Sequence, residues 1–364
     1  MEQNTHELRS MNLPKWIVLQ LLEKCNLRCH MCYEWGDMGS YHQKKDLHML
    51  ELEAIQSLVE DCKAVKPYYE LFGGEPLLYP RIDEVISLIK RRGSSVDMAT
   101  NGVLLQKSAE MLVNTELTRV WVSLDGPEAV NDAQRGTGTY RKALEGMDEI
   151  FKVRLSKGKE FPKVGVTTIV TPQNYRHIEA FFFELVNKRS IEHISIEFQT
   201  YATCEQYVKY KEVMEKNFNI PTDIAKGLVQ ELKSFEDIDA QHLANQIRNI
   251  KNYCTQNNIT FYNNPNTIDG DNYRHYFSGN WEKMTDKRKK CIFPWLHAEI
   301  TASGDVAMCH TFHDLTFGNI HQQSMREIWN NTLSRDFRKL LKAGLLPMCT
   351  ACSRYYTHTG TPTQ

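Results

Sequence analysis

The sequence has no long hydrophobic run and almost no net charge. Its longest apolar stretches are far too short to span a bilayer, and residues 1–15 lack the apolar core of a secretory signal. With 44 basic and 45 acidic residues, the formal charge is −1, so no overall field would attract a polyanion. These absences predict a cytoplasmic protein with no membrane partner and no nucleic-acid partner.

Cysteine is abundant by contrast. Ten cysteines in a reducing compartment are expected to bind metal rather than to form disulfides. Two of them have a simpler interpretation: Cys62 lies on the apolar stripe of an amphipathic helix and Cys254 on a mixed helix face, so both are predicted to be structural. With 364 residues and 41% hydrophobic content, the chain can form one large α/β domain with an appendage, or two domains.

Three further cysteines, Cys25, Cys29 and Cys32, lie within eight residues. They follow an apolar run at 16–22 that reads as a first β-strand, so the thiols leave its carboxyl end. Three thiolates can ligate three irons of a [4Fe–4S] cube and leave the fourth iron open to a small molecule. A zinc site or a redox thiol pair is the alternative.

The rest of the chain alternates between strands and helices. Strands are expected at 68–72, 95–100, 118–124, 163–170, 193–200 and 259–262, with amphipathic helices between most of them. Such a repetition implies a parallel sheet with right-handed crossovers, in which the chemistry gathers at the carboxyl ends of the strands. Residues 204–258 are mostly helical by pattern.

The second strand ends in Gly73-Gly74-Glu75-Pro76. This tetrad and the C-x3-C-x2-C loop one strand earlier resemble the radical SAM superfamily. The resemblance implies a partial (β/α)6 barrel, a cluster held by the three loop cysteines, and S-adenosylmethionine, whose amino group the tetrad would hold. It also implies reductive cleavage to a 5′-deoxyadenosyl radical, which takes a hydrogen atom from a substrate. Met31 matches the position that packs near the adenine.

Other residues are candidates for contacts to S-adenosylmethionine. Asn101 follows the third strand, and Ser123 and Asp125 share one face of the fourth. The segment around Ser123 resembles a family segment that contacts the ribose or carboxylate, although a strand-end turn with a capping aspartate also fits. Arg135 could pair with a carboxylate, or lie exposed in its loop.

The strand at 193–200 alternates apolar and polar residues, which predicts one face packed on helices and one facing a cavity. Glu197, Gln199 and Tyr201 are therefore candidates to line a substrate pocket, and equally plain exposed residues. Cys204 is the spare cysteine near this face. It is a candidate hydrogen-atom donor, with a buried structural thiol as the alternative.

A second cysteine group comprises Cys291, Cys309, Cys349 and Cys352. A hairpin turn at 302–305, which contains Gly304, would bring the first two together, and the C-x2-C pair would complete four ligands. Four thiolates can bind zinc or a fully ligated [4Fe–4S] cluster. The pattern resembles the twitch variant of the SPASM extension, which implies one auxiliary cluster. His310 and His313 are alternative ligands.

The predicted segments are a tail at 1–14, the barrel at 15–203, a mostly helical segment at 204–285 and the cluster region at 286–364. We expect the substrate to be a small molecule such as a sugar, aminocyclitol or nucleoside-like compound, which is dehydrogenated, dehydrated or epimerised. The alternatives are a peptide maturase, against which the 24 residues before Cys25 count, and a non-catalytic iron–sulfur or zinc protein. The basic run at 287–290 could dock a flavodoxin- or ferredoxin-like electron donor.

Overall fold

The computed structural model describes residues 13–36, 39–287, 290–311 and 313–356. Most of the predicted tail lies outside these ranges. So does the middle of the basic run, Arg288 and Lys289. Ten strands form one sheet in the order β10-β9-β8-β1-β2-β3-β4-β5-β6-β7. The strands are β1 (Trp16–Gln20), β2 (Tyr68–Phe72), β3 (Val96–Thr100), β4 (Arg119–Ser123), β5 (Lys163–Val170), β6 (His193–Phe198), β7 (Thr260–Asn264), β8 (His297–Ile300), β9 (Asp305–Ala307) and β10 (Thr316–Asn319).

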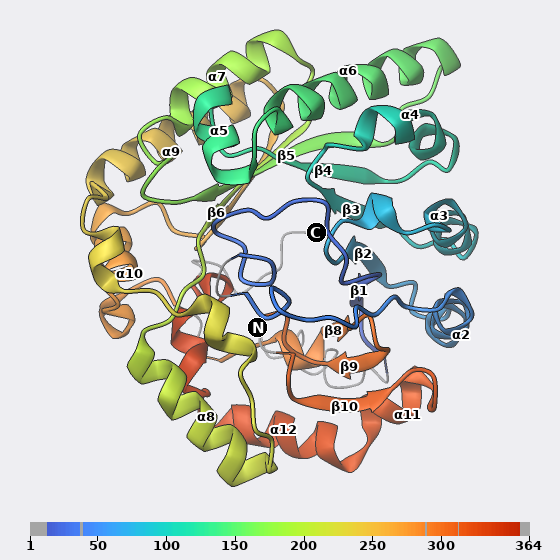
Figure 1. The fold of residues 1–364 in the computed structure, drawn as a ribbon, viewed down its shortest axis with the longest axis vertical. Helices are drawn as coiled ribbons and strands as arrows, with labels where there is room; N and C mark the ends of the chain where they lie inside the picture. Colours follow the sequence, from blue (N-terminus) through green and yellow to red (C-terminus); the bar gives the residue numbers. More distant parts are fainter. Residues whose placement is uncertain (1–12, 37–38, 288–289, 312, 357–364) are drawn as a thin grey trace.

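Helices surround the sheet as an outer ring (Figure 1). None of the described helices is both long enough and apolar enough to cross a membrane. The helices are α2 (Leu52–Cys62), α3 (Ile82–Arg91), α4 (Leu105–Asn114), α5 (Glu128–Arg135), α6 (Thr139–Lys157), α7 (Ile178–Lys188), α8 (Cys204–Phe218), α9 (Ala240–Gln256), α10 (Gly270–Phe277), α11 (Met325–Asn330) and α12 (Thr332–Ala343).

The sheet is a barrel that does not close. Strand β1 pairs in parallel with both β2 and β8, and the parallel pairing continues from β2 to β7. Strand β9 pairs antiparallel with both of its neighbours, β8 and β10. Among the described residues the edge strands β7 and β10 do not pair, so the predicted partial barrel with a small C-terminal extension is confirmed.

Alternation along the strands separates the core from the lumen. Ile17, Leu19 and Leu71 are fully buried in the hydrophobic core that the strands share with the helices, and burying each such side chain stabilises the fold by roughly 1.5–3 kcal/mol. The other face is mixed: it carries apolar residues such as Val18 together with ionisable groups such as Glu70 and Asp97. The barrel therefore encloses ionisable side chains rather than a continuous apolar core.

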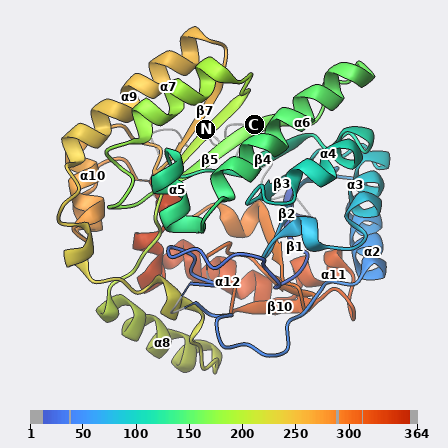
Figure 2. The ribbon, with the colours of Figure 1, turned by 45° about the horizontal axis from the view of Figure 1, so that its top comes forward.

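The C-terminal region covers the open side of the barrel. The 3-10 helix η6 (Pro347–Ala351) packs against α8, and Figure 2 shows α8 and α12 in the lower half of the molecule, across the barrel from α7 and α9. Just after η6, the Arg354 guanidinium lies 5.3 Å from the Trp16 ring of β1. The carbonyl of Tyr356 accepts a hydrogen bond from the Asn266 N–H, just after β7 (2.9 Å). This segment thus reaches from β1 to β7 across the open side of the barrel, whose edge strands are β7 and β10.

Candidate active site and auxiliary metal centre

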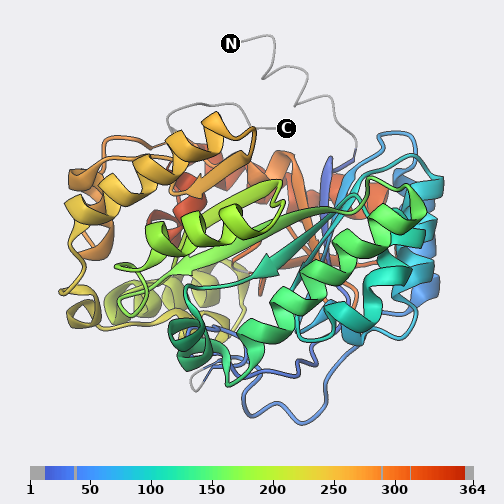
Figure 3. The ribbon, with the colours of Figure 1, turned by 90° about the horizontal axis from the view of Figure 1, so that it is seen from above.

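The three cysteines of the first loop lie close together where the chain leaves β1. Figure 3 shows this loop and α5 at the same end of the barrel. Burial, together with smaller contributions from neighbouring groups that include Cys29, raises the pKa of Cys25 to about 12 and that of Cys32 to about 11. All three are free, half-buried thiols, and sulfurs with so little access to water need a positive partner to exist as thiolates. A sulfur-only set of three fits a [4Fe–4S] cluster with one open iron.

Backbone amides and a tryptophan hold this loop in shape. The Leu27 N–H donates to the Cys25 sulfur (3.4 Å) and the Trp35 N–H to the Cys32 sulfur (3.3 Å). The Trp35 indole N–H donates to the Glu23 carbonyl (2.7 Å). Amide hydrogen bonds to thiolate sulfur stabilise the charged ligand, so the local chain is already arranged for metal binding.

Gly73 and Gly74 let the second turn approach the start of the cysteine loop. Gly73 has a φ of +126°, and a Cβ on Gly74 would lie 2.2 Å from the Lys24 carbonyl oxygen. The N–H groups of Gly74 and Glu75 donate to the carbonyls of Leu22 (2.8 Å) and Lys24 (3.0 Å). The two glycines therefore fix the backbone immediately before Cys25.

The Glu75 carboxylate is used inside the protein. It accepts hydrogen bonds from the Thr100 hydroxyl (2.7 Å), the Asn101 N–H (2.9 Å) and the Leu77 N–H (3.2 Å), and only 1% of the residue is exposed. Burial raises its pKa, which these hydrogen bonds oppose. Pro76 is buried in the 3-10 turn that follows. A direct contact of the tetrad with S-adenosylmethionine stays a prediction.

Asn101 carries this network to the cysteine loop. Its side-chain amide donates to the side-chain oxygen Oδ1 of Asn26 (2.8 Å), and Asn26 lies next to Cys25. Met31 and Ser123 are both half-buried, at the loop and at the end of β4 respectively. Contacts of these three residues with S-adenosylmethionine also stay predictions.

Asp125 and Arg135 form a buried ion pair beside Cys29. The Arg135 Nε lies 2.6 Å from the Asp125 Oδ2, with the two side chains 10% and 0% exposed. The Arg135 guanidinium also hydrogen-bonds the Cys29 sulfur, and its charge opposes the rise in the pKa of Cys29 that burial causes. Arg135 therefore pairs with Asp125 and does not lie exposed in a loop. Contacts of Asp125 and Arg135 with S-adenosylmethionine stay predictions.

The predicted polar face of β6 is formed only in part. Glu197 and Gln199 are half-buried, and the Ser195 hydroxyl donates to the Glu197 carboxylate (3.4 Å). The prediction for Tyr201 is wrong, because this residue is fully buried and its ring packs 4.3 Å from that of Phe235. The strand ends at Phe198, so its alternation does not extend to residue 201.

Cys204 is exposed. It is the first residue of α8, which Thr203 caps, so the alternative of a buried structural thiol is wrong. Cys62 and Cys254 are both buried, as the prediction of structural thiols requires.

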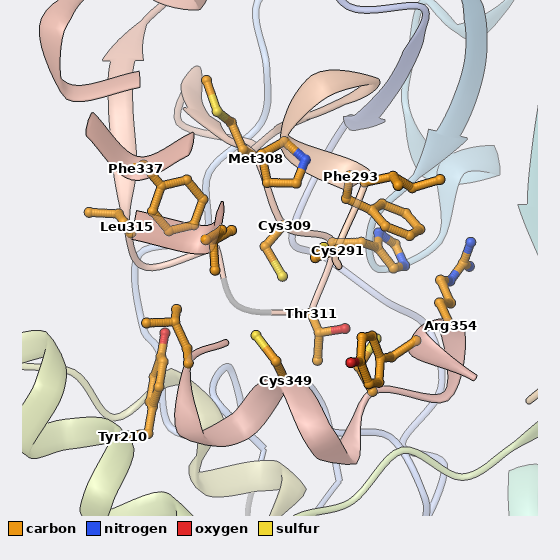
Figure 4. Close-up of a pocket in the computed structure, with 17 residues that line it drawn as sticks. Tyr210, Cys291, Phe293, Met308, Cys309, Thr311, Leu315, Phe337, Cys349 and Arg354 are labelled. Carbon is orange, nitrogen blue, oxygen red and sulfur yellow. The ribbon is translucent and has the colours of Figure 1, made fainter. Parts of the chain in front are cut away.

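The other four cysteines line a single cavity. Figure 4 shows the thiols of Cys291, Cys309 and Cys349 turned toward one another, and Cys352 lines the same cavity. Burial raises the pKa of Cys349, and the thiols of Cys291 and Cys352 raise it further. The remaining walls are mostly apolar, so this sulfur-only set fits the four-thiolate ligation of an auxiliary cluster.

The hairpin before this cavity forms as predicted. Strands β8 and β9 pair antiparallel, and Gly304 in the turn has a φ of +85°, which favours glycine. Because Cys291 precedes β8 and Cys309 follows β9, the hairpin brings these two cysteines to the same cavity.

Sequence reasoning missed a buried triad between the two cysteine groups. The Glu299 Oε2 lies 3.2 Å from the His297 Nε2 and 2.8 Å from the His310 Nδ1, and the Gln20 amide donates to the other oxygen (2.9 Å). Against the effect of burial, the two histidines lower the pKa of Glu299, and Glu299 raises that of His310. Alternation of His297 and Glu299 on a short strand was the available signal.

His310 and His313 had been considered as ligands of the second cluster. His310 instead binds Glu299 through its Nδ1, while it also lines the thiol cavity. His313 is buried, and its Nδ1 has no hydrogen-bond partner among the described residues.

Two family models match the chain. The radical SAM superfamily model covers residues 19–185, and the SPASM iron–sulfur cluster-binding domain covers residues 291–353. The chain belongs to the radical SAM superfamily. It is an enzyme that uses a [4Fe–4S] cluster and S-adenosylmethionine, with auxiliary iron–sulfur ligation in its SPASM region. The predictions of family, enzyme class and cofactors are confirmed.

Individual relatives differ in how much of the chain they share. A "tungsten-containing aldehyde ferredoxin oxidoreductase cofactor-modifying protein" of Pyrococcus furiosus is 25% identical, with 93% of this chain and 87% of that protein covered. The mycofactocin maturase MftC of Mycobacterium tuberculosis is 27% identical over 48% of this chain and 42% of its own length. Streptococcus suis SuiB with bound S-adenosylmethionine shares the fold at a TM-score of 0.64 and 17% identity, covering 96% of this chain and 75% of SuiB.

Proposed function

We propose that this radical SAM enzyme oxidatively modifies a peptide. The observation that carries the proposal is the position of the four-thiol cavity beside the lumen. Two residues that line this cavity also contact lumen groups: His310 binds Glu299, and Arg354 lies over Trp16. An electron acceptor in the cavity would therefore be close to a substrate held in the barrel.

When bound, the catalytic cluster and S-adenosylmethionine supply hydrogen-atom abstraction, and the auxiliary cluster supplies a place for one electron. An oxidation then removes two hydrogens from the substrate: one as a hydrogen atom, the other as a proton and an electron. The residues of this chain would bind the substrate, orient it and exclude water from it. Glu70 and Glu197 lie near Arg354 and contribute to its electrostatic environment, so the lumen offers groups of both signs for orienting a polar substrate.

The relatives favour a peptide over the small molecule expected first. MftC is named a maturase, and SuiB has been solved bound to its precursor peptide SuiA, with a fold covering 98% of this chain. The Pyrococcus furiosus relative, which is named for modifying a cofactor, matches almost the whole chain. Modification of a small molecule is therefore the second candidate, with a cytoplasmic flavodoxin- or ferredoxin-like electron donor in either case.

Co-expression provides the test. Each short open reading frame encoded beside this gene is expressed with the enzyme, and the peptide masses are measured by mass spectrometry. We expect one peptide to lose two hydrogens, and to keep them with a Cys349→Ala enzyme. In parallel, small-molecule fractions of cell extract are added to reconstituted holoenzyme with S-adenosylmethionine and dithionite. Unchanged peptides, together with a fraction that drives 5′-deoxyadenosine release, would reject the peptide in favour of the small molecule.

A further inference from the structure

The carboxyl end of α5 touches the cysteine loop through two consecutive residues. The His30 N–H, inside the loop, donates to the Gln134 carbonyl (3.0 Å). The side chain of Arg135, the last residue of α5, hydrogen-bonds the Cys29 sulfur. A cationic group is thus placed directly against one ligand of the catalytic cluster.

Asp125 keeps that guanidinium in place. One oxygen of its fully buried carboxylate lies 2.6 Å from the Arg135 Nε, and the other accepts the Ile169 N–H of β5 (2.9 Å). Its own N–H donates to the Asn131 side chain (3.0 Å). Because the carboxylate is tied to two neighbouring elements, Arg135 is held between a fixed anion and the thiol.

We propose that Arg135 and Asp125 set the reduction potential of the catalytic cluster, with opposite signs. Reduction adds one negative charge to a cluster already surrounded by thiolates. A nearby positive charge and hydrogen bonds to sulfur favour the reduced form, and a nearby carboxylate disfavours it. Arg135 therefore raises the potential and Asp125 lowers it. Both residues act on the reduction of the catalytic cluster, which precedes the reaction with any substrate. The inference is therefore independent of the proposed substrate class.

This role differs from a contact with S-adenosylmethionine, because it exists before that molecule binds. The test is an anaerobic redox titration of the reconstituted holoenzyme without S-adenosylmethionine, followed by electron paramagnetic resonance. The signal of the catalytic cluster is identified by its change when S-adenosylmethionine is added afterwards. Iron content and the dissociation constant of S-adenosylmethionine are measured for every variant.

The variants have different expected signs. Arg135→Gln lowers the midpoint reduction potential of the catalytic cluster. The ratio of reduced to oxidised cluster at a fixed potential then falls about tenfold, which corresponds to a shift of about 59 mV for one electron. Asp125→Asn raises the midpoint reduction potential of the catalytic cluster. Arg135→Lys keeps the positive charge, so its midpoint potential stays near that of the unmodified enzyme. Arg141→Gln is the matched control, because Arg141 forms an exposed ion pair with Glu128 and should not change the midpoint.

A purely structural role would move both midpoints in the same direction or only lower the iron content. An unchanged midpoint in Arg135→Gln, with weakened S-adenosylmethionine binding, would make Arg135 a ligand of that molecule and overturn the proposal. If the Arg135→Gln protein fails to bind iron, the Asp125→Asn variant provides the test. A midpoint reduction potential that is unchanged or lowered in Asp125→Asn also overturns the proposal.

Discussion

Replacing Gly74 with alanine tests how tightly the second turn holds the cysteine loop. The new Cβ would lie 2.2 Å from the Lys24 carbonyl oxygen and 2.6 Å from that of Glu23. Contacts shorter than 3.0 Å essentially do not occur, so the backbone must separate by at least about 0.8 Å in a close-packed region. The displaced chain runs directly into Cys25.

The energetic cost follows from the hydrogen bonds that this shift disrupts. The N–H groups of Gly74 and Glu75 donate to Leu22 and Lys24, and each such bond contributes about 0.5–1.5 kcal/mol. We expect Gly74→Ala to lower the free energy of unfolding by about 1–3 kcal/mol. We also expect anaerobic reconstitution to give about four irons per chain instead of about eight, because only the auxiliary cluster would form.

Gly344→Ala is the matched control. No atom lies within 4 Å of the position that its new Cβ would take, and its φ of −174° suits any residue. Urea unfolding, iron analysis and 5′-deoxyadenosine release are measured for both variants. A Gly74→Ala protein with unchanged stability, a full iron content and normal 5′-deoxyadenosine release would refute the claim that this turn positions the cluster loop.

Other predictions test the remaining thiols and one histidine. Cys29→Ala should lose about four irons and all 5′-deoxyadenosine release; release at the normal rate would contradict its assignment as a ligand. Cys349→Ala should also lose about four irons but keep 5′-deoxyadenosine release. Loss of that release would mean that the catalytic and auxiliary sites have been assigned the wrong way round. If Cys204 donates hydrogen to a substrate radical, Cys204→Ala should abolish the incorporation of deuterium from heavy water into the product. Unchanged incorporation would show that Cys204 is not the donor. Burial lowers the pKa of His193 from 6.5 to about 4, so its unfolded form binds more protons in that interval and stability should fall on acidification from about pH 6.5 to 4. His193→Gln should flatten this part of the stability curve, and an unchanged slope would exclude His193 as its source.

Local patterns were sufficient for much of the fold. The strands expected at 68–72 and 163–170 have those bounds in the structure, because a strand carries its signal in consecutive residues. Less regular strand ends were misjudged by one or two residues. The misplacement of Tyr201 arose in this way, since alternation cannot show where a chain leaves a sheet.

Both cysteine groups were also identifiable in advance. The spacing of Cys25, Cys29 and Cys32 is a property of one short loop, and the hairpin at Gly304 is encoded by local turn chemistry. Close sequence spacing forces the thiols of the first loop into one neighbourhood whatever the rest of the chain does. For the second group, a short hairpin and a C-x2-C turn leave few arrangements to consider.

The sequence by itself thus determined the alternation of strands and helices in the barrel core, its family and the two sets of thiols. Only the tertiary structure decided that the Glu75 carboxylate binds groups inside the protein, that Arg135 lies between Asp125 and Cys29, and that Glu299 contacts two histidines. Gln20 and Glu299 meet across 279 residues because β8 returns to pair with β1. Such contacts depend on the register of the whole sheet, and no local pattern encodes that register.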